Sequence, residues 1–143
     1  MAAELVLHLR NDVGELERVA TTLAAFGARH ALAERDVFEV TLALDEVLTN
    51  VIWYAFDDEA VHDIVVRLWL DDGLLHVEVE DDGRSFDPLT VPSAAEELAQ
   101  PVEERRVGGL GLHLVRRTMH ALAYQRDMGR NRLTMSKHVA PRE

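Results

Sequence analysis

The chain has 143 residues, no cysteine, 15 basic and 26 acidic side chains, and a formal net charge of −11. This length suits one domain, so we expect residues 1–143 to form a single folding unit. The absence of cysteine excludes disulfides, thiolate nucleophiles and cysteine-ligated zinc sites. The acidic charge argues against nucleic acid as a partner, and no apolar stretch has the length or flanks of a membrane helix or signal peptide. We therefore expect a cytoplasmic protein that binds neither nucleic acid nor membranes.

The first half of the chain predicts one strand and two helices. Apolar residues alternate with others over positions 5–10, which is typical of a half-buried strand. Asn11 or Asp12 can cap a following helix, which we expect to end at Gly27. A second helix over about 34–56 has an apolar stripe and no internal glycine or proline.

The next segment predicts a hairpin and then a long loop. Two alternating runs, 64–70 and 75–79, are joined by Asp72-Gly73, a pair that favours a tight hairpin turn. Residues 84–107 have no periodicity and contain several prolines. A loop of this length in a compact domain is usually functional, so we expect a lid over a site.

The last quarter of the chain predicts a third helix over about 110–122 and a closing hairpin formed by 123–127 and 132–139. The resulting order is strand, two helices, two strands, lid, helix and two strands. Helices that are grouped away from a mainly antiparallel sheet define an α+β protein. We therefore expect a two-layer sandwich with the helices on one face of the sheet.

The first pattern that carries chemistry is Glu46 with Asn50 on the long predicted helix. Residues four apart lie one turn apart on the same helix face. Carboxylate and amide oxygens there could hold a water and a hard cation such as Mg²⁺. Spacing alone favours a solvated helix face, but apolar neighbours on both sides make the polar face narrow and weaken that interpretation.

The second pattern follows the predicted strand that ends near residue 80. A buried carboxylate at Asp81 can accept a hydrogen bond from an exocyclic amine such as that of adenine, and Gly83 allows close approach of the backbone. The same carboxylate would reject guanine, because two acceptors would then face each other. The alternative is a solvated acidic turn.

The third pattern is a glycine-rich segment before the third predicted helix, formed by Gly108, Gly109 and Gly111. Open backbone amides at a helix N-terminus favour phosphate binding. From their charge and position, we infer that Arg105 and Arg106 contact the terminal phosphate. A simple helix start is the alternative interpretation of the glycines.

The order of these three patterns resembles the GHKL ATP-binding superfamily, which includes gyrase, a heat-shock chaperone, histidine kinases and mismatch-repair ATPases. Within it, the chain is most similar to the small anti-sigma factor serine/threonine protein kinases of bacteria. The resemblance covers nearly the whole chain and implies a Bergerat-type ATP-binding fold. The matching motifs are the N box Glu46-x-x-x-Asn50, the first glycine box Asp81-x-Gly83-x-x-Phe86-Asp87 and the second glycine box Gly108-Gly109-Leu110-Gly111-Leu112.

The resemblance implies a role for each matching residue. Asn50 would coordinate a Mg²⁺ ion that bridges the ATP phosphates, and Glu46 would orient or deprotonate the attacking hydroxyl. Asp81 would hold the adenine amine, with Gly83 beside the base. The remaining residues expected to bind ATP are Phe86, Gly108, Gly109, Leu110, Gly111, Leu112 and Thr134.

The implied function is an ATP-dependent kinase that phosphorylates a serine or threonine of an anti-sigma antagonist, sequesters a sigma factor and forms a homodimer. A non-catalytic module of the same fold that senses ATP and binds a partner stays open as the alternative. The detached ATP-binding domain of a histidine kinase is a third possibility, against which the short length argues. Two positions depart from the family pattern: Tyr54 stands where many members have histidine, and Ser85 where histidine kinases usually have glycine.

Overall fold

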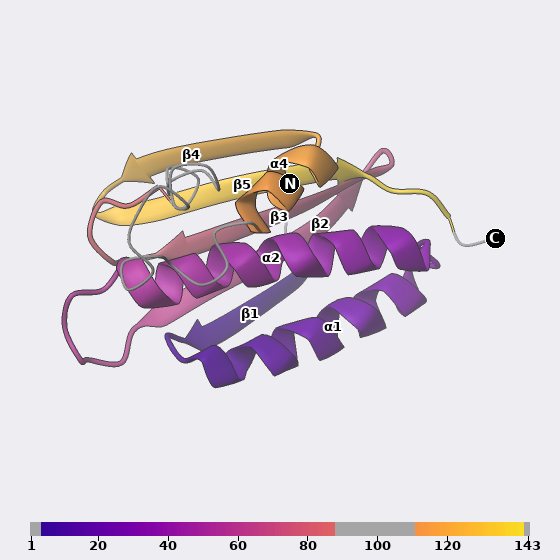
Figure 1. Ribbon diagram of the computed structural model, residues 1–143. Coiled ribbons are helices and arrows are strands. Elements are labelled where there is room, and N and C mark those ends of the chain that lie inside the picture. The colour runs from indigo at the N-terminus through magenta and orange to yellow at the C-terminus, as the bar shows by residue number, and fades with distance from the viewer. Residues whose placement is uncertain (1–3, 88–110, 142–143) are drawn as a thin grey trace, which may run out of the picture.

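The computed structural model describes residues 4–87 and 111–141 of the chain (Figure 1). Apart from a short 3-10 helix, η1, the order of its helices and strands is the predicted one. No helix within these residues is long and apolar enough to cross a bilayer. The elements are β1 (Leu5–Arg10), η1 (Val13–Glu15), α1 (Leu16–Arg29), α2 (Glu34–Tyr54), β2 (Asp63–Asp71), β3 (Leu74–Asp81), α4 (Gly111–Thr118), β4 (Ala121–Asp127) and β5 (Arg130–His138).

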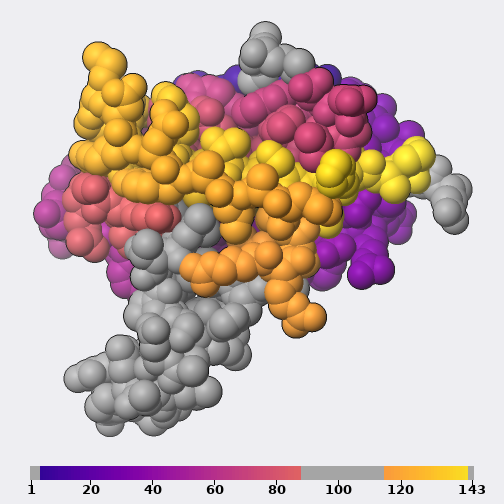
Figure 2. All heavy atoms as spheres, turned by 90° about the horizontal axis from the view of Figure 1, so that it is seen from above, coloured from indigo at the N-terminus to yellow at the C-terminus, as the bar shows by residue number. Residues whose placement is uncertain are grey.

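The five strands form one antiparallel sheet in the order β1-β2-β3-β5-β4. Helices α1, α2 and α4 lie on one face of this sheet (Figure 1). The predicted α+β sandwich with its helices on one face is therefore confirmed. Strand β4 is an edge strand with mostly exposed side chains, and it lies beside β5 on the side of the molecule seen in Figure 2.

Two tight turns connect the antiparallel hairpins. Asp72 and Gly73 join β2 to β3 with φ angles of 51° and 79°, and Met128 and Gly129 join β4 to β5 with 53° and 77°. Positive φ at both central residues matches the right-handed twist of the flanking strands. The Asp-Gly pair was readable from the sequence, because glycine adopts this conformation without steric cost.

Helix α1 does not end at Gly27, as the sequence predicts, but continues to Arg29. Gly27 is buried inside the helix, where an added Cβ would lie 2.5 Å from Cγ2 of Val37 on α2. This glycine therefore allows α1 and α2 to approach closely. Helix α4 is also shorter than predicted, since the chain has already joined the sheet through the bond from the His120 amide to the Ser136 carbonyl.

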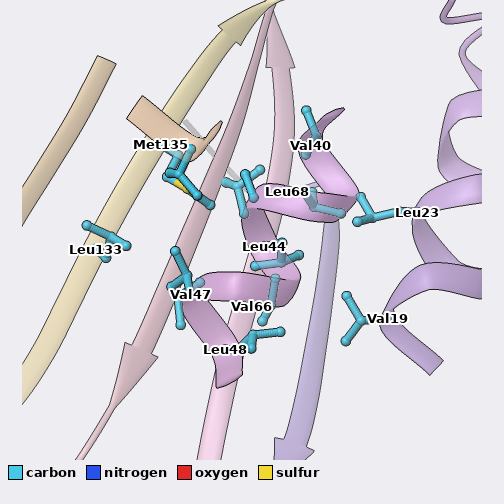
Figure 3. Close-up of a cluster of buried hydrophobic side chains, with 14 of the residues drawn as sticks. Val19, Leu23, Val40, Leu44, Val47, Leu48, Val66, Leu68, Leu133 and Met135 are labelled. Carbon is cyan, nitrogen blue, oxygen red and sulfur yellow. The ribbon is translucent and has the colours of Figure 1, made fainter. Parts of the chain in front are cut away.

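The core lies between the helices and the covered face of the sheet (Figure 3). Alternate residues of the strands point toward α2, whose apolar stripe contributes Val40, Leu44, Val47 and Leu48. Leu133 and Met135 of β5 point the same way. Because the side-chain period of a strand is two, Asn131 and Lys137 of β5 lie on this covered face as well.

Candidate functional site

Asp81 is the last residue of β3 and lies on the covered face of the sheet, where only 2% of its surface is exposed. Its Oδ1 atom accepts a hydrogen bond of 2.9 Å from the amide of Gly83, which bends the chain away from the strand. The other hydrogen bond that the described residues give to this carboxylate also reaches Oδ1. Among residues 4–87 and 111–141, no group donates a hydrogen bond to Oδ2 of Asp81.

The turn after Asp81 is held against the C-terminal end of α2. An added Cβ at Gly83 would lie 2.3 Å from the carbonyl oxygen of Ala55, so only glycine fits here. The amide of Arg84 donates to the same carbonyl at 2.8 Å, and its Nε donates to the carbonyl of Tyr54 at 2.7 Å. This contact brings the second sequence motif to the end of the helix that carries the first.

Asn131 joins Asp81 to the rest of the turn, and its side chain is almost fully buried. Its Nδ2 atom donates to Asp81 Oδ1 at 2.9 Å and to the carbonyl of Arg84 at 2.7 Å. Its Oδ1 atom accepts from the Tyr124 hydroxyl at 2.6 Å, from Nη1 of Arg126 at 2.9 Å and from the Phe86 amide at 3.3 Å. A network in which both ends of a buried amide are satisfied holds one geometry.

The sequence did not point to Asn131, Tyr124 or Arg126. A signal was present in the alternation of β5, because Leu133 and Met135 must face the core and Asn131 then shares their face. The same alternation corrects the prediction for Thr134. Its backbone pairs with Glu78 on the opposite face of the sheet from Asp81, so Thr134 does not lie with the other predicted residues.

The carboxyl of Asp81 has an elevated pKa. Burial raises it most, and the nearby Asp82 adds to the rise. The hydrogen bonds from Asn131 and Gly83 and the charge of Arg126 oppose the rise without cancelling it. A buried carboxylate that its own protein leaves incompletely compensated is suited to accept a hydrogen bond from a ligand.

The N-box pair occupies neighbouring turns of α2. Asn50 has no exposed surface, whereas Glu46 is half-buried. Asn50 lies one helical turn before Tyr54, whose carbonyl accepts from Arg84 in the turn after β3. The amide oxygen of Asn50 is a hard ligand of the kind that Mg²⁺ accepts from a protein while keeping waters and phosphate oxygens.

The second glycine box is only partly described. Gly111 is the first residue of α4, and Leu112 lies in the first turn of that helix. Val115 is fully buried in the core, and α4 packs on α2, the helix of Glu46 and Asn50. The remaining predicted residues, Arg105, Arg106, Gly108, Gly109 and Leu110, lie outside the described part of the chain.

Phe86 is half-buried beside the aromatic residues at the end of α2. Its ring centroid lies 6.1 Å from that of Tyr54, and the Arg84 guanidinium lies 5.7 Å from the centre of the Phe86 ring. Tyr54, the position that departs from the family pattern, thus contributes its ring and its carbonyl to the support of the turn.

The chain is similar to several known proteins. Residues 9–137 match the family described as the histidine kinase-like ATPase domain. The serine/threonine-protein kinase BtrW of Bordetella bronchiseptica is 35% identical over 142 residues, which cover 92% of this chain and 96% of that protein. The serine-protein kinase RsbW of Bacillus cereus is 28% identical over 123 residues, which cover 85% of this chain and 76% of that protein.

A solved structure shares the fold. It is the histidine kinase domain of a blue-light activated histidine kinase from Erythrobacter litoralis, with a TM-score of 0.51 and 23% sequence identity. The match covers 88% of this chain and 60% of the solved chain.

Proposed function

This chain belongs to the histidine kinase-like ATPase domain family, and on that premise we propose that it is an ATP-dependent serine/threonine protein kinase that also acts as an anti-sigma factor. Its substrate would be a serine or threonine of an anti-sigma antagonist. The similarity to two named protein kinases over most of their length supports the kinase activity.

The observation that best supports ATP binding is the burial of the Asp81 carboxylate, together with the hydrogen bonds that orient it. One carboxylate oxygen is held by Gly83 and Asn131, and the group is buried without full compensation of its charge. The second oxygen would accept a hydrogen bond from the 6-amino group of adenine. Guanine has an oxygen at this position, so two hydrogen-bond acceptors would face each other. The site should therefore select ATP over GTP.

The divalent ion would be held by Asn50 together with the phosphates. Bound Mg²⁺ would supply charge neutralisation of the phosphate oxygens. The amides at the start of α4 and of the glycine box before it would hold the phosphates, because a helix N-terminus attracts anions. Arg105 and Arg106 would add contacts to the terminal phosphate.

Glu46 would act on the attacking hydroxyl. In the transfer, the hydroxyl oxygen of the substrate forms a bond to the γ-phosphorus as the bond from this phosphorus to the β–γ bridging oxygen breaks, and ADP leaves. The Glu46 carboxylate would accept the hydroxyl proton. Positioning and charge neutralisation account for most of the catalysis of such transfers, so one carboxylate is a sufficient base.

The partners follow from the same proposal. We infer a homodimer that holds a sigma factor and an antagonist protein in the cytoplasm, with no nucleic acid among its ligands. The single domain expected for residues 1–143 is consistent with a sheet and helices that share one core.

The experiment is a measurement of ATP binding and of phosphate transfer by wild type, Glu46→Gln and the matched control Asp45→Asn. Asp45 precedes Glu46 on α2 but is exposed. We expect calorimetry to detect Mg²⁺-dependent ATP binding by all three proteins and much weaker binding of GTP. Transfer of labelled phosphate to a candidate antagonist should fall by about 100-fold or more in Glu46→Gln alone.

Two results would overturn parts of the proposal. Wild-type protein that binds no ATP would remove the nucleotide site altogether. ATP binding without transfer to any antagonist that binds the protein would leave the non-catalytic sensing module.

A further inference from the structure

His62 lies between α2 and β2 and has a carboxylate at each ring nitrogen. Its Nε2 atom is 2.7 Å from Oδ1 of Asp58, and its Nδ1 atom is 3.2 Å from Oδ1 of Asp82. The side chain of His62 is 18% exposed, whereas those of Asp58 and Asp82 are about half exposed. Asp82 is the residue between Asp81 and Gly83, so one side of this arrangement is the turn of the candidate nucleotide site.

The imidazole is held in place by neutral groups from two further segments. It stacks on the Phe56 ring, with 4.3 Å between ring centroids and 16° between the planes. The His62 amide donates to Oδ1 of Asn11 at 2.8 Å, and Nδ2 of Asn11 donates to the carbonyl of Ala60 at 3.3 Å. The ring therefore has a defined position relative to the end of β1 and the end of α2.

Two acceptors at the two ring nitrogens demand two N–H donors. A neutral imidazole has one, whereas the imidazolium has both. Within the described part of the chain, the titratable groups that face the ring are Asp58 and Asp82. The hydrogen bond with Asp58 raises the pKa of His62 most, burial opposes this, and Asp82 raises it further, so the balance favours the protonated form.

The turn held by His62 is the one that orients Asp81. Gly83, next to Asp82, donates its amide to Asp81 Oδ1, and the following amide, of Arg84, donates to Ala55. A shift of Asp82 would therefore move the amide that fixes the Asp81 carboxylate.

We propose that His62 is a positioning residue that, when protonated, holds Asp82 and with it the Asp81–Gly83 turn, so that binding of adenine nucleotides is coupled to protonation of His62. The inference rests on the proposed nucleotide site. The folded state favours the charged form of His62. The stabilising contribution of the protonated ring is therefore complete below the unfolded pKa of about 6.5, and it is lost as pH rises through the higher pKa of the folded state.

The first test measures ATP affinity between pH 6 and 9 for wild type, His62→Gln and His76→Gln. Glutamine can hydrogen-bond but does not titrate. His76 is a matched control, because it is a half-buried histidine that stacks on Trp69 and contacts Ser136 on the other face of the sheet. Comparison with wild type at each pH cancels the ionisation of ATP itself.

We expect His62→Gln to bind ATP roughly 3- to 10-fold more weakly than wild type at pH 6, with the ratio approaching one at pH 9. His76→Gln should follow wild type throughout. A ratio for His62→Gln that stays constant across the pH range would refute the coupling, since a merely structural loss would not titrate.

The second test uses nuclear magnetic resonance on wild-type protein without nucleotide, so it does not depend on the folding of a variant. The amide signal of Gly83 should shift with the same midpoint as the imidazole signals of His62, and that midpoint should lie above about 6.5. A Gly83 amide that does not follow His62 would overturn the proposal. If Gly83 follows His62 but the wild type binds no ATP at any pH, the positioning of the turn is supported and the proposed nucleotide site fails.

Discussion

Glu80 and Asp81 are consecutive buried carboxylates on opposite faces of the same strand. They differ in the groups that surround them: arginines surround Glu80, whereas amides surround Asp81. Glu80, on the open face, accepts from Arg132 at 3.2 Å and from Arg67 at 3.4 Å, and lies 3.4 Å from Arg130. Asp81, on the covered face, accepts one hydrogen bond from the backbone amide of Gly83 and one from the side-chain amide of Asn131.

Their pKa values move in opposite directions. Burial alone would raise the pKa of Glu80, but the hydrogen bond from Arg132 and the charges of Arg130 and Arg67 outweigh it, so the pKa is lowered. For Asp81, burial dominates and the pKa is raised. The protein thus neutralises the charge of Glu80 with its own cations but leaves the charge of Asp81 only partly compensated. A buried group of this kind is a candidate for binding a ligand.

Asp81→Asn should produce the largest effect. The amide can keep its oxygen toward Gly83 and Asn131 and would then present its NH₂ group to the adenine amine. Loss of an acceptor and the opposition of two donors should weaken ATP binding by about 30- to 200-fold. Calorimetry measures the affinity. Because a carboxyl with a raised folded pKa costs stability at neutral pH, the thermal midpoint should stay or rise. Wild-type affinity in this variant would remove Asp81 from the site.

Gly83→Ala should damage both the site and the fold. The new methyl group would lie 2.3 Å from the Ala55 carbonyl, so the turn or the end of α2 must move, at a cost of about 1–3 kcal/mol. Urea unfolding and ATP binding measure the two losses. Gly73→Ala is the control: its φ of 79° strains the backbone, but no atom lies within 4 Å, so stability alone should fall. Equal ATP affinity in both variants would show that the close approach at Gly83 is unimportant.

Glu80→Gln should lower stability and leave ATP affinity unchanged, the reverse of Asp81→Asn. Removing the charge that pairs with three arginines should cost about 1–3 kcal/mol of unfolding free energy. The pKa of Glu80 in the folded state is lowered. Its charge therefore stabilises the fold above the ordinary pKa of 4.5, and this stabilisation is lost as pH falls through the folded-state pKa. The stability difference between variant and wild type should therefore narrow in acid. A weakened ATP site in this variant would contradict the separation of the two faces.

Arg35→Ala should have the smallest effect. Arg35 pairs with Glu39 at 3.2 Å on the surface of α2, and its side chain is 88% exposed. Exposed pairs four apart on a helix contribute about 0.3–0.5 kcal/mol. A loss of more than about 1 kcal/mol in urea unfolding would mean that charge pairs outside the network around Glu80 also matter.

The elements that the sequence predicted well are those with local signals. Alternation marked the strands, Asp72-Gly73 marked its turn, and the apolar stripe of α2 marked the long helix. The predicted end of α1 at Gly27 was wrong, because a glycine needed for contact with Val37 looks the same in a sequence as one that ends a helix.

The residues of the candidate site also differ in whether a local sequence signal predicted their position. Asp81 and Gly83 could be proposed from the sequence because they adjoin a strand end. The structure shows that Asp81 is buried at the end of β3 and that Gly83 lies against Ala55, while their role in nucleotide binding stays a prediction. Thr134 was assigned to the wrong face, and Asn131 was missed, because a hydroxyl attracts attention in a sequence while the direction of a side chain depends on strand register.

The sequence by itself determined the order of the helices and strands and the spacing of the motifs, since these follow from periodicity and turn chemistry over a few residues. Only the tertiary structure decided that the Ala55 carbonyl meets Gly83, that Asn131 reaches Asp81 across 50 positions of chain, and that His62 faces Asp82. Such contacts depend on how the strands pair and how α2 packs on the sheet. Pairing and packing bury side chains from distant segments together, and no local pattern of residues specifies which side chains will meet.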